Sequence, residues 1–166
     1  MVAPSAGLSY SERVKSRPMA PTDSAAAYDA DFFAWTRRTA ELLRARRFDE
    51  VDVEHAAEEI EDMGRRDARE LNRRLQVVLM HLLKWKLQPK KRTRSWQTTL
   101  LSQRSEIDTL LRDSPSLRHK LPVDLPRNYE RAVTRAAVET GLRADRFPPQ
   151  CPFTVLQILD EKFLSA

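Results

Sequence analysis

Apolar residues recur every three to four positions between Val53 and Gln88, which makes this the longest periodic stretch of the chain. The spacing predicts one amphipathic α-helix, because residues three and four apart lie on the same helix face. The phase continues through Gly64, so we expect a single helix, weakened or bent at that glycine. At ~1.5 Å per residue such a helix is roughly 50 Å long. A helix of that length needs other helices packed along it, which predicts a bundle.

Capping residues and prolines mark where the helices begin and end. Asp29 or Asp31 can cap a first helix, and Asp52 caps the long one. Pro89 ends the long helix because proline cannot continue the hydrogen-bond ladder. Ser95 can cap the helix that follows, which we expect to end near residue 113.

The C-terminal third of the chain contains several prolines and one glycine. Ser114-Pro115 predicts a short helical turn near residue 116, and two further prolines confine the segment after it. A fourth helix follows and carries Tyr129, Val133, Ala136, Ala137 and Thr140, and Gly141 supplies a left-handed stop. Thr154 caps a last short helix near residue 156.

We therefore predict an all-α fold, a four-helix-like bundle built on one long central helix, with short accessory helices. Residues 1–27 lack periodicity and predict a disordered N-terminal tail, while residues 28–166 form a single α-helical bundle domain. The expected core consists of Phe32, Trp35, Leu42, Ile60, Leu71, Leu75, Val78, Leu82, Trp85, Trp96, Leu100, Ile107, Leu110, Tyr129, Val133 and Leu156.

Composition narrows the class of protein. The hydrophobic fraction is 41% and the charged fraction 32%, and no apolar run approaches the ~20 residues that a membrane span requires. The N-terminal stretch lacks the apolar centre of a secretory signal. Cys151 is the single cysteine, so no internal disulfide can form. We expect a cytoplasmic protein with no membrane contact.

The distribution of charge is uneven. The net charge is +5, but residues 41–70 are rich in acids, whereas Leu71 to Ser105 contains none while lysines and arginines accumulate. This polarity indicates an anionic partner more strongly than the net charge does.

Eight short motifs occur in fixed order after the tail. They are Tyr28-Asp29-x-Asp31-Phe32-x-x-Trp35, Glu58-Glu59-Ile60-Glu61-x-Met63-Gly64, His81-Leu82-Leu83-Lys84, Gln88-Pro89, Ser95-Trp96, Gln103-Arg104, Ser114-Pro115-Ser116-Leu117 and Phe147-Pro148-x-x-Cys151-Pro152-Phe153-Thr154. Together they resemble the bacterial helical family catalogued as domain of unknown function number twenty-nine. The resemblance implies a small α-helical bundle and brings no activity or catalytic residues.

A carboxylate-rich stretch is the first candidate for chemistry. Glu54, Glu58 and Asp62 lie four apart on one helix face, as in bundles that bind divalent metals for hydrolysis. No histidine has a glutamate three residues before it, and no matching acidic pair follows on a later helix. Favourable four-apart ion pairs on a solvated face, such as Glu70–Arg74, explain the charges equally well.

A basic, tryptophan-bearing turn is the second candidate, with the binding residues Lys84, Lys86, Lys90, Lys91, Arg92 and Arg94. Clustered cations beside Trp85 and Trp96 could bind phosphates and stack bases. The same cations could dock on an acidic protein surface, including the acidic half of a second copy. The tryptophans also fall on apolar helix faces, and late cations complement the helix dipole.

Two further residues have structural explanations. His81 lies beside the apolar stripe without an Asp or Cys companion, which favours a hydrogen-bonded core residue. Cys151 has no basic neighbour in the sequence, which favours a buried thiol.

The sequence favours a non-enzymatic interaction module whose basic turn binds an acidic protein partner. Nucleic-acid binding through that turn and metal-dependent hydrolysis at the carboxylate face stay open as alternatives. We assign no catalytic residue, no metal site and no cofactor.

Overall fold

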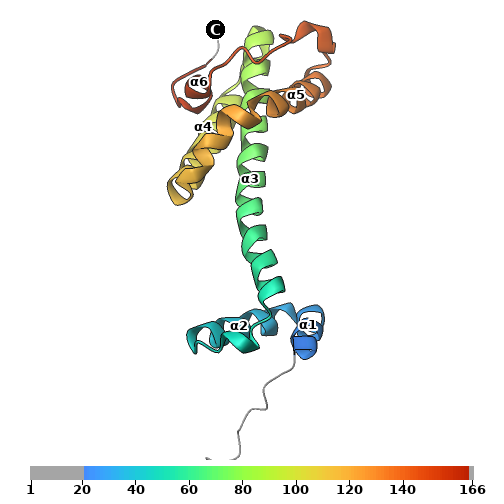
Figure 1. Ribbon diagram of the computed structural model, residues 1–166. Helices are drawn as coiled ribbons and strands as arrows, with labels where there is room; N and C mark the ends of the chain where they lie inside the picture. Colours follow the sequence, from blue (N-terminus) through green and yellow to red (C-terminus); the bar gives the residue numbers. More distant parts are fainter. Residues whose placement is uncertain (1–20, 165–166) are drawn as a thin grey trace, which may run out of the picture. The chain divides into compact units, whose positions relative to one another are not determined.

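The regular structure is helical throughout the described range. The computed structural model describes the backbone of residues 21–164 and the side chains of residues 26–164. Within that range the α-helices are α1 (Pro21–Ala30), α2 (Phe32–Arg44), α3 (Val53–Leu87), α4 (Arg94–Asp113), α5 (Lys120–Thr140) and α6 (Val155–Leu159), and short 3-10 turns lie at Phe48–Glu50, Pro89–Lys91, Pro115–His119 and Ala144–Arg146 (Figure 1). The predicted all-α class and the single long helix through Gly64 are confirmed.

The described chain divides into two compact units within α3, the first ending at Asp62 and the second beginning at Met63. Of the expected N-terminal tail, residues 1–20 lie outside the described residues, and residues 21–27 are helical in α1. That residues 28–166 form one domain stays a prediction. The four-helix detail is not confirmed.

The first unit is ordered by helix caps and by ring contacts. The Asp31 carboxylate accepts a hydrogen bond from the Ala34 amide at 2.9 Å, which caps α2. The expected Asp52 cap is also present, with the His55 amide at 3.3 Å. Trp35 is buried on the inner face of α2, and the Tyr28 ring packs edge-on against it at a centroid distance of 4.9 Å.

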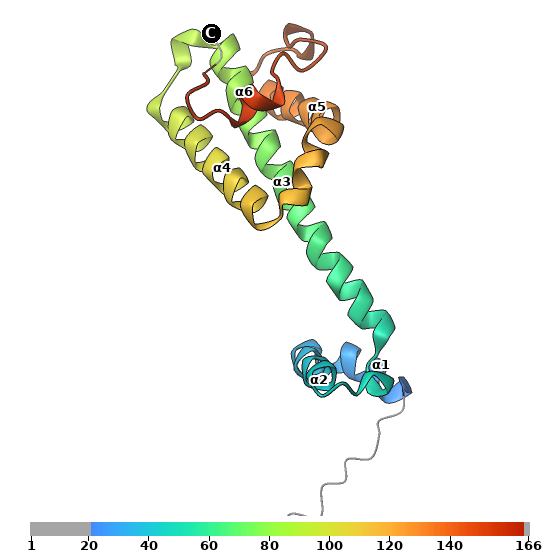
Figure 2. The ribbon, with the colours of Figure 1, turned by 60° about the vertical axis from the view of Figure 1, so that its left-hand side comes forward.

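The second unit is built around the C-terminal part of α3. Figures 1 and 2 show α4 and α5 packed along this part of the helix, with α6 beside them. Ten of the eleven side chains from Leu75 to Trp85 are buried, so this segment is covered on every side. The sequence explains this burial, because residues 77–83 are apolar except for His81, and a helix that is apolar on nearly all sides has to be buried on nearly all sides.

Local signals end the helices of the second unit largely as expected. α3 ends at Leu87, two residues before Pro89, and Gly141 ends α5 in the left-handed region with a φ of 72°. Thr154 caps α6 in a reciprocal capping box with Gln157. The cap of α4 is Thr93 and not the expected Ser95, and its hydroxyl accepts from the Trp96 amide at 3.4 Å.

Helix α5 begins earlier than the sequence indicates. It starts at Lys120 and includes both Pro122 and Pro126, which we expected to lie before the helix. Pro122 fits the first turn, where amide hydrogens have no partner inside the helix. Pro126 lies inside the helix, where it removes one backbone hydrogen bond.

Three residues of the predicted core are exposed. Phe32 is 47% exposed and Ile60 67% exposed, because the short helices of the first unit cover little of their surface. Leu156 is 82% exposed, whereas Ile158, two positions later in the same short helix, is buried. Two residues turn a helix by about 200°, so only one of them can face the core.

The buried Arg104 ties the C-terminal segment to α4. Its guanidinium donates hydrogen bonds to four backbone carbonyls, those of Ile158 at 2.8 Å, Phe163 at 3.0 Å, Gln157 at 3.3 Å and Glu161 at 3.4 Å. Several of these carbonyls lie at or after the end of α6 and have no partner within that helix. One side chain thus provides hydrogen-bond donors for backbone carbonyls at the end of α6 and in the segment that follows it.

Replacing Arg104 by Ala should destabilise the second unit, because the four carbonyls lose a charged donor inside the protein. We expect the free energy of unfolding to fall by about 3 kcal/mol, measured by urea denaturation. Arg104→Lys should recover little of this loss, since an ammonium cannot reproduce the guanidinium fork.

Arg112→Ala on the same helix is the matched control, because Arg112 is exposed and pairs only with Asp108 and Thr109 in the described residues. It should change the free energy of unfolding by less than about 0.5 kcal/mol. Equal losses in the two Ala variants would contradict the role given to Arg104.

Candidate functional site

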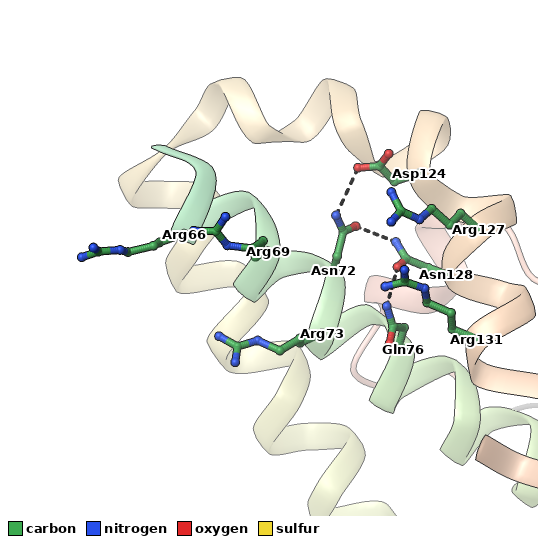
Figure 3. Close-up of a pocket in the computed structure, with 9 residues that line it drawn as sticks. All are labelled: Arg66, Arg69, Asn72, Arg73, Gln76, Asp124, Arg127, Asn128 and Arg131. Carbon is green, nitrogen blue, oxygen red and sulfur yellow. Dashed lines mark hydrogen bonds between the residues drawn. The ribbon is translucent and has the colours of Figure 1, made fainter. Parts of the chain in front are cut away.

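A groove rich in arginine lies between α3 and α5 in the second unit (Figure 3). Its volume is about 360 Å³. Its lining includes five arginines and a single carboxylate, and we call it the arginine groove. The lining residues are Arg66, Arg69, Asn72, Arg73 and Gln76 of α3 and Asp124, Arg127, Asn128 and Arg131 of α5.

A chain of side-chain amides joins the two helices at this groove. Gln76 Nε2 donates to Asn128 Oδ1 at 2.9 Å, and Asn128 Nδ2 donates to Asn72 Oδ1 at 2.6 Å. Asn72 Nδ2 then donates to the carboxylate of Asp124 at 3.3 Å. Gln76 and Asn128 are buried, so these bonds satisfy polar groups that would otherwise be costly to bury. The amide chain therefore fixes the position of α5 along α3.

Three of the five arginines are available to a ligand. Arg69, Arg127 and Arg131 are exposed, and none of them is ion-paired with a carboxylate in the part of the chain that the structure describes. Arg73 pairs with Glu70 on its own helix. Figure 3 shows Arg127 and Arg131 extending from α5 beside the amide chain. Guanidinium groups in this number suit carboxylates or phosphates, which they bind through paired hydrogen bonds.

Two of the six cations expected to bind a partner make contacts within the structure, although Arg92 is exposed. Lys84 is buried, and its Nζ lies 2.5 Å from the Glu139 carboxylate and 4.5 Å from the centre of the Trp96 ring. Arg92 donates from Nε to the backbone carbonyl of Trp85 at 2.9 Å and lies 5.0 Å from the centre of that ring. Both side chains stabilise the end of α3.

The other four cations of the turn are exposed. Lys86 extends from the last turn of α3, Lys90 and Lys91 lie in the 3-10 turn, and Arg94 begins α4. No ion pair involves any of them among the described side chains. The six cations of the basic turn stay predicted partner-binding residues, and these four are the ones without an ion pair or ring contact among the described residues.

The carboxylate face receives no support as a metal site. Glu54 and Glu58 are exposed, and no group of three or more His, Cys, Asp or Glu side chains within residues 26–164 could hold a metal ion. The expected pair of Glu70 and Arg74 is present at 2.7 Å.

His55 and Tyr28 use neighbouring carboxylates for structural contacts. His55 Nδ1 lies 2.7 Å from Asp52, and its ring stacks on that of Tyr28 at 4.2 Å. The hydrogen bond to Asp52 raises the pKa of His55. The Tyr28 hydroxyl donates to Glu59 at 2.7 Å. These contacts hold α1 against the first turns of α3.

The two remaining candidates are buried or half-buried. His81 is buried beside Trp96, and its Nδ1 has no hydrogen-bond partner among the described residues. Burial, followed by the nearby charge of Lys84, lowers the pKa of His81. Cys151 is half-buried, and burial raises the pKa of its thiol, which disfavours the reactive thiolate.

The sequence analysis missed the arginine groove. Two signals for it exist in the chain, since Arg69 and Arg73 are four residues apart and so are Arg127 and Arg131. Each spacing places two guanidinium groups on one helix face. Only the packing of α5 on α3, more than fifty residues apart in the chain, brings the two pairs to one groove.

No helix within the described residues is long and apolar enough to cross a membrane.

The depressed pKa of His81 predicts a dependence of stability on pH. The unfolded chain binds a proton near the ordinary histidine value of about 6.5, whereas the folded protein binds it only at lower pH. Stability from this group is therefore complete above about pH 6.5 and is lost as the pH falls toward the folded pKa. His81→Gln, which does not titrate there, should lose less stability to urea than the wild type does as the pH falls from about 7 to 5.

The difference between the two profiles isolates His81, because the raised pKa of His55 contributes equally to both proteins and with the opposite sign. Parallel profiles between about pH 7 and 5 would show that the folded protein protonates His81 as readily as the unfolded chain does.

Comparison with known proteins gives one match. The family model described as "Domain of unknown function DUF29" matches residues 27–164, which is most of the chain. No curated protein and no solved structure matches the chain. The match agrees with the motifs in the sequence and with the helical fold, and the chain belongs to the DUF29 family.

Proposed function

We propose that this protein is a non-enzymatic interaction module that binds an acidic segment of a protein partner in the arginine groove. The observation that supports this most directly is the set of five arginines around one groove, opposed by a single carboxylate. That carboxylate, Asp124, already accepts a hydrogen bond from Asn72. Arg73 is paired with Glu70, but Arg69, Arg127 and Arg131 form no ion pair among the described residues, so the groove has an excess of positive charge.

The spacing of the arginines suits an acidic helix or extended segment. Arg69 and Arg73 follow one wall, and Arg127 and Arg131 follow the other. Residues four apart on a helix are about 6 Å apart along its axis. A partner with carboxylates at a similar interval can thus pair with more than one guanidinium on each wall.

The rigid wall of the groove is a second argument for binding. The amide chain of Asn72, Gln76 and Asn128 fixes α3 against α5 before any partner arrives. A preformed site loses less conformational entropy when a ligand binds. The lining side chains supply positive charge and hydrogen-bond donors, which are the groups that bind carboxylates.

The exposed cations of the basic turn form a second positive surface in this proposal. Three of its four residues are lysines, namely Lys86, Lys90 and Lys91, and the fourth is Arg94. A lysine ammonium acts as a point charge and lacks the paired donors of a guanidinium. We propose that these four cations attract an acidic partner over a distance, and that the groove makes the specific contacts with it.

The proposal predicts that loss of the groove arginines weakens the binding of an acidic peptide. The probe is a fluorescent helical peptide of Glu and Ala with glutamates four residues apart, measured by fluorescence anisotropy. Arg69→Ser, Arg127→Ser and Arg131→Ser together should raise its Kd about tenfold, since each exposed charge contributes roughly 0.5 kcal/mol.

The matched control removes the same charge from the basic turn, as Lys90→Ser, Lys91→Ser and Arg94→Ser. Its Kd should rise less than that of the groove variant. A larger effect in the control would move the site to the basic turn, and no binding by the wild type would overturn the proposal. A single-stranded oligonucleotide that binds more tightly than the peptide, with affinity falling steeply with salt, would indicate a nucleic-acid-binding protein instead.

A further inference from the structure

The two units have opposite charge. Residues 26–62, the part of the first unit whose side chains the structure describes, contain eleven acids and five arginines, a formal net charge of −6. Residues 63–166 contain 21 lysines and arginines and 11 acids, a net charge of +10. The positive unit contains the arginine groove, and the negative unit is itself an acidic protein surface of the kind that the groove suits.

The negative charge of the first unit is concentrated in one segment. Residues 49–62 contain eight acids and no lysine or arginine. Most of this segment forms the first turns of α3, where Glu54 and Glu58 are exposed. Neither glutamate forms an ion pair with a described residue. These two carboxylates are therefore available to a cation from another molecule.

Large apolar side chains are exposed in the same turns of α3. Val53 is 61% exposed and Ile60 is 67% exposed. Apolar surface beside carboxylates is typical of a helix that packs on a partner. Two such segments would repel each other because both are acidic, so the partner that fits is a basic surface.

The spacing of the carboxylates matches the groove. Glu54 and Glu58 are four residues apart, as are Arg127 and Arg131 on one wall and Arg69 and Arg73 on the other. An acidic helix laid in the groove can place its two glutamates opposite two arginines. The aliphatic stems of the arginines offer apolar surface to Val53 and Ile60.

We propose that the occupant of the arginine groove is the acidic segment 49–62 of a second copy of this chain. The inference rests on the proposed function, because it names the partner of the same groove. Each copy has one acidic segment and one groove, which are different surfaces. Each contact joins two different surfaces, so copies associate either reciprocally in a closed two-fold pair or head to tail in a longer assembly.

Self-association should depend on protein concentration and weaken as salt rises, because exposed charge pairs are screened. Sedimentation velocity of the full chain over a range of concentrations measures both effects. A species that stays monomeric at every concentration at low salt would overturn the inference. It would do so even if the groove binds the Glu-Ala peptide, in which case the proposed function still stands.

A charge swap tests the pairing of the two surfaces. One variant carries Glu54→Arg and Glu58→Arg, and the other carries Arg127→Glu and Arg131→Glu. Each variant alone should associate less than the wild type at low salt, because charges of like sign then face each other at the two positions where the glutamates meet the arginines of α5. An equimolar mixture should associate, because the groove of the first variant binds the acidic segment of the second.

The results distinguish association through the groove and the acidic segment from association through another surface. Association of either variant alone to the same extent as the wild type, or of the wild type to the same extent in high salt, would place the contact elsewhere and overturn the inference. Circular dichroism shows whether both variants melt at the same temperature as the wild type. If they do, a mixture that stays monomeric would also overturn the inference. Where a variant fails to fold, Glu54→Gln with Glu58→Gln and Arg127→Gln with Arg131→Gln replace the reversals. Each neutral pair should then reduce the association of the chain at low salt, and unchanged association would contradict the pairing.

Discussion

The burial of α3 from Leu75 to Trp85 is the constraint on which the second unit depends. A helix covered on all sides needs neighbours on all sides, and α4, α5 and the segment around α6 provide them. The same burial takes polar side chains out of water, so each needs a partner nearby. Gln76 donates a hydrogen bond to Asn128 of α5, and Lys84 forms an ion pair with Glu139, which also belongs to α5. These contacts fix α5 in place, and the arginines at the edge of the amide chain consequently line one groove.

The charge distribution connects this architecture with function. Most of the buried surface of the second unit is apolar, so its surplus of positive charge lies outside the core. Arg104 is an exception, because four backbone carbonyls bind its guanidinium inside the protein. In the groove, Arg69, Arg127 and Arg131 are exposed and form no ion pair among the described residues. Separation of opposite charges into two units of one chain favours association by electrostatic attraction, with apolar contacts adding affinity once the surfaces meet.

Local features were predictable from the sequence and long-range ones were not. The period of α3, the Asp31 and Thr154 caps and the Gly141 stop follow from residues within a few positions of one another. The burial of Lys84 depends on Glu139, which is 55 residues away, so the sequence indicated an exposed cation. The groove depends on the packing of α5 on α3, and the late start expected for α5 concealed its first turns. Leu156 and Ile158 show that a five-residue helix is too short for periodicity to choose the buried face.

The central claim is that the groove arginines, and not the basic turn, make the specific contact with carboxylates. Arginine side-chain NMR tests this directly, since the Nε–H signals of single arginines report on hydrogen bonding at each guanidinium. On titration with the Glu-Ala peptide, the signals of Arg69, Arg127 and Arg131 should shift together and saturate at one peptide per chain, while Arg112 stays unchanged. Shifts confined to Arg92 and Arg94, or no shift at saturating peptide, would contradict the account.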